Sequence, residues 1–284
     1  MSQTQEQGFS LVSGLAAELS KGDLKLPSLP ESVIRIKNAL SEPDFTVEEL
    51  ARLIRPEPSL TGSILTMANS VAFKRAGNET TDLKIAISRI GSGMVQTAAT
   101  TFALRQLRES AEFKDVEHLL EPEWARATRA AAASYLVAQV SRKAKPDEAM
   151  VVGLMHNIGR IYLYSRAKKY PDLFSSPADV ETLLGSWHAS VGKAIVEHWN
   201  LPADAALAIE RQDEISDEED IAPMVNILTA GIAIVALSEE PAPEELSALA
   251  ARIDFQKLGL SEDIIAEIAG KREELRQELG LNIH

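Results

Sequence analysis

Apolar residues recur every three or four positions along most of the chain, which is the spacing of one face of an α-helix. None of these segments sustains the alternation of apolar and polar residues that is typical of a strand. The pattern predicts helices over residues 9–20, 33–40, 46–54, 60–68, 82–90, 94–108, 123–143, 150–165, 188–199, 203–211, 221–237, 243–251 and 262–279. The sequence therefore predicts an all-α chain.

Residues that start and stop helices punctuate this pattern. Thr46 and Glu49 form a capping box at the start of one helix. Pro177, which follows a serine that can cap a helix, marks another start. We expect the helix that begins there to be interrupted near Gly185. The charged stretch over residues 109–122 ends in a proline and predicts a weak break between two parts of the chain.

Composition narrows the class of protein. The chain has 284 residues, 45% of them apolar, so it can bury a sizeable core as one large domain or two small ones. It contains no cysteine, which excludes disulfide scaffolds, zinc ribbons, thiol nucleophiles and iron–sulfur clusters. No apolar run reaches the ~18–20 residues that span a bilayer, and the first residues lack the basic region of a signal peptide. We therefore expect a cytoplasmic protein.

The charge balance is acidic, with 42 acidic and 29 basic side chains and a net charge of −13. This charge argues against nucleic acid and against anionic membranes as partners. Six carboxylates fall within residues 213–220. Blocks of like charge usually lie in water, so a solvated loop is favoured there over a metal or partner site.

Five histidines are the only imidazoles available for catalysis or metal binding. His118 lies in a charged connector and His284 at the end of the chain, which leaves His156, His188 and His198. A histidine on an apolar helix face is usually a core residue with a hydrogen-bonded partner, and we favour this reading for His188 and His198. The chain contains neither a phosphate-binding glycine loop nor a nucleophile elbow.

Four segments carry distinctive motifs. Residues 26–70 contain an LPxLP entry, an EPSL turn before a helix, and Met-Ala-Asn-Ser at the end of that helix. Residues 83–91 read LKIAISRIG, residues 153–160 read GLMHNIGR, and residues 188–202 read HASVGKAIVEHWNLP. In this order the segments resemble the HDOD domain, the HD-related output domain of bacterial signalling proteins. The resemblance covers about residues 24–238.

The resemblance implies an all-helical fold with two lobes. It places an N-terminal lobe at about 24–110 and a degenerate HD-like lobe at about 111–238. Helical extensions would precede and follow them, over residues 1–23 and 239–284. We expect the two lobes to pack as one unit, because the resemblance runs across their boundary.

The HD superfamily, to which this fold belongs, includes phosphohydrolases whose divalent metal is held by a His, an adjacent His-Asp pair and a later Asp. Here Arg126 stands where the first His is expected, and the pair is His156-Asn157. Gly231 stands near the register of the late Asp. Because only His156 remains of the four ligands, we expect neither a metal nor another cofactor.

Other positions complete the degenerate site that the resemblance implies. Gln212-Asp213 takes the place of a His-His pair that is frequent in the family, and Glu181 and His188 are further pocket candidates. Arg126 could supply the missing positive charge by pairing with Glu181 or Asp213. The alternative is that Arg126 points into solvent.

The lost ligands and the resemblance together favour a non-catalytic signalling module that binds a partner protein, which the sequence does not identify. The first alternative is an enzyme, a metal-dependent phosphohydrolase with a rearranged site of His156, His188, Glu181 and Asp213.

A second alternative is a pocket that binds a nucleotide without cleaving it, with Arg126 and Arg160 facing a phosphate. The two extensions are candidates for a homodimer or partner surface. Packing of both extensions on the core is favoured, because amphipathicity shows only that one face is buried.

Overall fold

The structure is a computed structural model that describes residues 13–14, 17–18, 21, 28–74, 79–111, 113–166, 177–281 and 283. Every regular element in these residues is helical, so the predicted all-α class is confirmed. Within the helix predicted over 9–20, residues 13–14 and 17–18 are described and helical, and the others lie outside the described residues. No described helix is long and apolar enough to cross a membrane.

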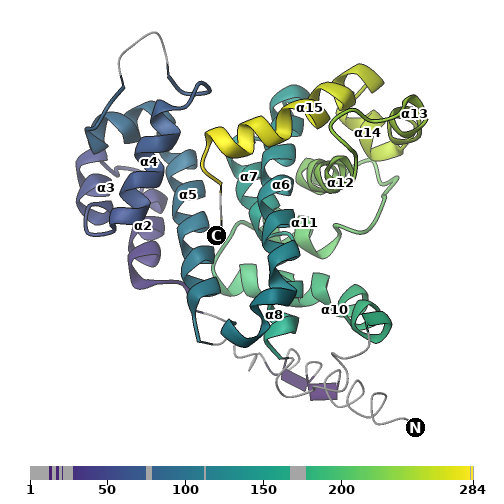
Figure 1. Ribbon diagram of the computed structural model, residues 1–284, viewed down its shortest axis with the longest axis horizontal. Coiled ribbons are helices and arrows are strands. Elements are labelled where there is room, and N and C mark those ends of the chain that lie inside the picture. The colour runs from purple at the N-terminus through teal and green to yellow at the C-terminus, as the bar shows by residue number, and fades with distance from the viewer. Residues whose placement is uncertain are drawn as a thin grey trace.

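The first lobe is built around α5, on which three shorter helices pack. The bounds are Glu31–Ser41 for α2, Val47–Ile54 for α3, Pro58–Asn69 for α4 and Leu83–Glu109 for α5. Figure 1 shows the three short helices gathered on one side of α5. Thr46 caps α3 as predicted, because its Oγ1 accepts a hydrogen bond from the backbone N–H of Glu49 at 3.2 Å. Ile36, Leu50 and Leu60 are fully buried in this lobe.

One kinked helix, α5, replaces the two helices predicted over 82–90 and 94–108. Gly91 lies at the junction, where its φ of 81° and ψ of 167° are far from helical values. Glycine adopts positive φ without a steric penalty, so the chain can bend here and resume the helix. Gly91, which was predicted to end a helix, therefore kinks a helix that continues beyond it.

The second lobe has α6 as its axis, with α7, α12 and α15 packed along it. The bounds are Glu117–Ser141 for α6, Pro146–Met155 for α7, Ile158–Ser165 for α8, Pro177–His198 for α10, Ala203–Glu210 for α11, Pro223–Val235 for α12, Pro243–Ala250 for α13, Ile253–Leu258 for α14 and Glu262–Glu278 for α15. A run of buried alanines over residues 130–133 lets neighbouring backbones approach α6 closely. At Gly153 of α7, a Cβ would lie 2.7 Å from the carbonyl oxygen of Ala130.

The two lobes meet where α5 packs on α7. A lysine from the first lobe adds a polar contact between them. Lys37 of α2 donates to the carbonyl oxygens of Trp199 and Asn200, the second at 2.7 Å, just after the end of α10. These carbonyls lie at the negative end of the α10 dipole, where a cation is stabilising.

The residues after α15 also reach across to the first lobe. Leu279, Leu281 and Ile283 are fully buried, with at most 2% of their surface exposed. Arg108 of α5 donates to the carbonyl oxygen of Ile283 at 2.5 Å, and Arg105 donates to the backbone nearby. The C-terminal residues therefore connect α15 to α5.

Several helix bounds differ from those predicted. The helix expected over 150–165 is two helices, α7 and α8, separated at His156. The helix α10 continues through Gly185, which is exposed and only lowers helix propensity. Because α6 begins at Glu117, Pro122 lies inside this helix and not before it. The short helix α14 was not predicted.

We expect two glycine-to-alanine substitutions to have opposite effects on stability. In Gly159→Ala the new Cβ would lie 1.9 Å from the carbonyl oxygen of His188 and 2.7 Å from the backbone nitrogen of Gly192. This substitution should lower the free energy of unfolding by about 3 kcal/mol or more. In Gly185→Ala the Cβ meets nothing within 4 Å, and the free energy should rise by about 0.5–1 kcal/mol.

Urea denaturation of the two variants and the wild type checks this prediction. A Gly159→Ala variant within 1 kcal/mol of the wild type would contradict the close approach of α8 to α10.

Candidate functional site

His156 and Asn157 lie in the break between α7 and α8. The break frees the backbone carbonyl of His156, which accepts a hydrogen bond from Nε2 of Gln212 at 2.8 Å. Gly159, in the first turn of α8, allows this helix to touch the backbone of α10 at His188. The break therefore brings Gln212 and His188, which are distant in sequence, to the end of α7.

The buried carboxylate of Glu123 is the centre of the first polar group at this site, and its residue is 6% exposed. Asn157 Nδ2 donates to the backbone carbonyl of Glu123 at 2.7 Å and to its Oε2 at 3.0 Å. Arg160 Nε donates to Glu123 Oε1 at 2.7 Å, and Arg160 also donates to Glu181 Oε1 at 2.9 Å. Burial disfavours the charged guanidinium, but the two carboxylates outweigh it and raise the pKa of Arg160.

The second polar group joins His188 of α10 to Asp213. His188 Nε2 lies 2.8 Å from Asp213 Oδ2, and the side chain of His188 is 8% exposed. The hydrogen bond from His188 lowers the pKa of Asp213 below its ordinary value. The other ring nitrogen of His188, Nδ1, is buried and has no hydrogen-bond partner in the described part of the chain.

His156 is a buried, neutral imidazole. Its Nδ1 lies 2.7 Å from the carbonyl oxygen of Gly153, which can only accept, so Nδ1 carries the proton. Burial, assisted by the positive charge of Arg126, lowers the pKa of His156 to about 3. Its Nε2 is left as a bare acceptor, and neither this atom nor Asn157 Oδ1 has a partner among the described residues.

Arg126 does not form the ion pair that was hypothesised from the sequence. The two expected partners bond elsewhere, Glu181 to Arg160 and Asp213 to His188. Arg126 is exposed on α6, and none of the described residues forms an ion pair with it. Its charge still contributes to the lowered pKa of Asp213, after the larger effect of His188.

Gly231 lies on α12, where this helix presses against α6. A Cβ at Gly231 would lie 2.5 Å from Oγ and 3.1 Å from the backbone nitrogen of Ser134. This contact leaves no room for the carboxylate that the HD superfamily places near this register. Gly231 is therefore part of a packing contact between helices, and not of the hydrogen-bonded groups around Glu123 and His188.

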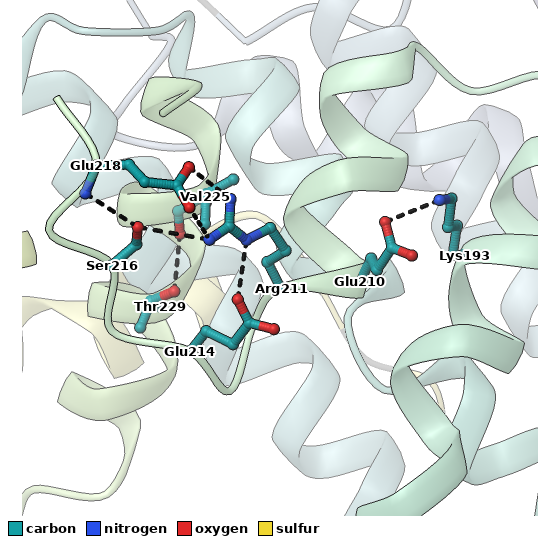
Figure 2. Close-up of polar contacts among 8 residues, drawn as sticks. All are labelled: Lys193, Glu210, Arg211, Glu214, Ser216, Glu218, Val225 and Thr229. Carbon is teal, nitrogen blue, oxygen red and sulfur yellow. Dashed lines mark hydrogen bonds and ion pairs between the residues drawn. The ribbon is translucent and has the colours of Figure 1, made fainter. Parts of the chain in front are cut away.

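The acidic stretch that follows α11 is exposed but firmly held. Arg211 donates to Glu214 at 2.9 Å and, through both terminal nitrogens, to Glu218 at 2.9 and 3.0 Å (Figure 2). Lys257 of α14 donates to the backbone carbonyls of Ser216 and Glu218 at 3.0 and 2.6 Å. The acidic stretch, which the sequence predicts to be a solvated loop, is thus held by two cations, Arg211 and Lys257.

Two residues of the site were missed or misread in the sequence. Glu123 was not considered, although a carboxylate beside an apolar Trp124 in a helix is a sign of burial. Arg160 was considered only as a phosphate-binding residue, whereas it forms the ion pair with Glu181 that was hypothesised for Arg126. Both residues lie on helices, and the pattern does not reveal which arginine faces the buried carboxylate.

A divalent-metal site of the HD type does not fit these residues. Among the described residues, no three His, Asp or Glu side chains are grouped so that they could hold a metal ion. The carboxylates of Glu123 and Asp213 are each bonded to Arg160 or His188. One imidazole and one neutral amide are too few ligands to compete with water for a divalent ion.

We expect His156 to make stability depend on pH. Its pKa is about 3 in the folded state and 6.5 ordinarily, so the unfolded chain binds more protons between these values. The contribution of His156 to the free energy of unfolding is therefore full above pH 6.5 and decreases as the pH falls toward 3. From pH 7 to pH 4 its contribution should fall by about 3 kcal/mol.

Denaturation curves across this pH range measure the effect. His156→Gln should flatten the pH dependence, whereas His198→Gln, at an exposed histidine, should leave it unchanged. Equal slopes in the wild type and in His156→Gln would show that His156 is not held neutral.

We expect Arg160→Met to lower the free energy of unfolding by about 3–5 kcal/mol, because it leaves the carboxylate of Glu123 buried without a cation. The double variant with Glu123→Gln should recover much of this loss, since the uncompensated charge is gone. As a control, Glu181→Gln removes an exposed partner and should cost under about 1 kcal/mol. Additive effects of the two buried substitutions in a double-mutant cycle would contradict the pairing.

The fold is similar to those of several solved structures. A candidate metal-dependent phosphohydrolase from Shewanella amazonensis superposes with a TM-score of 0.71 at 21% identity, over 93% of this chain and 99% of its own. An HDOD domain protein of unknown function from Geobacter sulfurreducens gives a TM-score of 0.68 at 22% identity, over 94% and 96%. A candidate signal transduction protein from Marinobacter aquaeolei gives 0.61 at 19% identity, over 96% and 66%. At these identities the likeness shows the fold alone.

One curated relative, an uncharacterized protein from Treponema pallidum, is 25% identical over 205 residues, or 66% of this chain. The chain spans 37% of the length of that protein. The sequence model of the HDOD domain matches residues 26–215, about two thirds of the chain, and this stretch includes both polar groups of the site. The chain therefore belongs to the HDOD domain family.

Proposed function

We propose that this chain is a non-catalytic regulatory module of signal transduction that acts by binding a partner protein. The observation that carries the proposal is the ion-pair chain Glu123–Arg160–Glu181 together with Asn157. By the resemblance, Asn157 stands at the position where an HD hydrolase has a metal-ligating Asp, and its amide bonds to Glu123 within this chain of ion pairs. Here the carboxylates neutralise a guanidinium instead.

The chemistry of hydrolysis supports the same conclusion. A metal-dependent phosphohydrolase uses its metal to lower the pKa of a bound water and to offset the charge of the phosphate. Arg160 is permanently charged and cannot activate water. His156 is neutral and buried, with its proton on the nitrogen that faces Gly153, so it is poorly placed to exchange protons with a substrate.

The family supports the signalling half of the proposal. The HDOD domain is the output domain that the sequence resembles, and one structural neighbour is described as a signal transduction protein. A module without its own chemistry transmits a signal through differential binding of a partner.

The proposal that the chain is non-catalytic is tested by measuring metal content and hydrolysis on the same sample. The full chain, purified without chelator and then incubated with manganese, should hold well under one ion per chain by elemental analysis. It should not hydrolyse bis(p-nitrophenyl) phosphate above the rate of the buffer. The physical reason is that Asn157 and the paired carboxylates leave too few ligands.

Two controls make this result decisive. A metal-loaded HD phosphohydrolase measured in parallel establishes the sensitivity of both assays. His156→Ala distinguishes adventitious metal from a site, because only bound metal that disappears in this variant belongs to the candidate site. One or two ions per chain with turnover, both lost in His156→Ala, would make the chain an enzyme.

Site-specific photo-crosslinking of the full chain in its host cells tests the partner half. A photoreactive residue is placed in turn at exposed positions of each lobe, such as Ile34, Val71 and Ile253. A discrete adduct with one polypeptide, confined to neighbouring positions and displaced by excess unmodified chain, is the expected result. Absence of an adduct at every position would contradict a role in partner binding.

A further inference from the structure

A cavity of about 330 Å³ lies at the junction of the two lobes, away from the polar site. It is enclosed by α5, α7, α11 and the start of α12, and none of its lining residues belongs to the groups around Glu123 and His188. Its walls are mainly aliphatic and come from Val151, Val152, Leu201, Ala205 and Met224. The volume and the apolar lining are those of a site for a small organic molecule.

Three polar side chains at this cavity, those of Lys143, Gln96 and Asp204, have no partner among the described residues. Lys143 is exposed at the rim, and no described residue pairs with it. Gln96 of α5 is half-buried, and its side-chain amide bonds to none of the described residues. The neighbouring Lys145 is different, because it forms an ion pair with Glu148 at 2.7 Å. Asp204 is exposed in the first turn of α11 and can only accept, so Lys143 and Gln96 are the hydrogen-bond donors available to orient a ligand.

The sign of the ligand's charge follows from the helices that begin here. The first turn of α7 contains Asp147 and Glu148, and that of α11 contains Asp204, which offset the positive ends of these two helices. The first turn of α12 has no acidic residue, and no side chain caps it. The four charged side chains of the lining sum to zero. Because Lys145 is paired with Glu148, Lys143 and the start of α12 are the positive groups left without a paired carboxylate among the described residues.

We propose that this cavity binds a small organic anion with an apolar body, whose acidic group lies between Lys143 and the first turn of α12. The apolar body packs against Val151 and Leu201, and the amide of Gln96 donates to its polar edge. A second, narrow cavity of about 30 Å³ adjoins these residues and leaves room for one methyl-sized group. This site goes beyond the proposed function, which requires no small ligand.

Fluorescence titration of the full chain with anilinonaphthalene sulfonate tests the proposal. This probe has an aromatic body and one anionic group, and its emission rises on entering an apolar site. We expect saturable binding of one molecule per chain. The uncharged phenylnaphthylamine, which lacks the sulfonate, should bind more weakly.

Two variants and a control locate the probe. Lys143→Glu reverses the charge at the rim and should weaken binding roughly tenfold, because attraction becomes repulsion. Ala205→Trp fills the cavity and should remove the saturable binding while circular dichroism and the melting temperature stay close to those of the wild type. Lys271→Glu makes the same charge change at an exposed position on α15, outside the cavity lining, and should leave binding unchanged.

Several results would overturn the site. Non-saturable binding by the wild type would mean that no defined cavity takes the probe. Equal binding by Lys143→Glu, or equal affinity for the uncharged probe, would remove the anionic part of the assignment. Lys143 is exposed, so this variant still decides the question if Ala205→Trp fails to fold. None of these results depends on metal content, so the site and the proposed function can fail separately.

Discussion

Burial of one carboxylate, that of Glu123, constrains how the second lobe is assembled. A carboxylate removed from water requires a cation and hydrogen-bond donors, and an unpaired one would cost several kcal/mol. Arg160 supplies the cation from α8, Asn157 supplies the amide from the break before α8, and Glu181 on α10 balances the remaining charge. Because Glu123 lies on α6 and its two donors lie on α8 or just before it, α6 and α8 cannot shift separately without leaving the buried carboxylate uncompensated.

The same pairing separates this site from a metal centre. A divalent ion and a guanidinium compete for the same carboxylate oxygens, and the guanidinium is attached to the chain and permanently charged. With Arg160 in place, further positive charge nearby is unfavourable. His156 fits this environment because it is neutral, and the lowered pKa that burial and Arg126 give it keeps it so.

Local physical chemistry made much of the fold predictable. The cap at Thr46 and the conformational freedom of Gly91 act within a few residues, so the sequence reveals them directly. The break at His156 depends on tertiary contacts instead: Gln212 bonds its carbonyl from 56 residues away, and Gly159 packs on α10. The motifs therefore pointed to His156, Asn157 and His188, whereas Glu123 and the pairing among these residues depended on which side of each helix is buried.

The helix α7 extends from the cavity at the lobe junction to the polar site around Glu123 and His188. Its first turns line the cavity at the lobe junction, and its last residue precedes His156 at the polar site. The ten residues of α7 extend about 15 Å, and every one from Ala149 to Met155 is buried. A buried helix moves only together with the helices on which it packs. A ligand that displaced the start of α7 would therefore also shift His156 and, through the break, the contact with Gln212 that holds the start of the acidic loop.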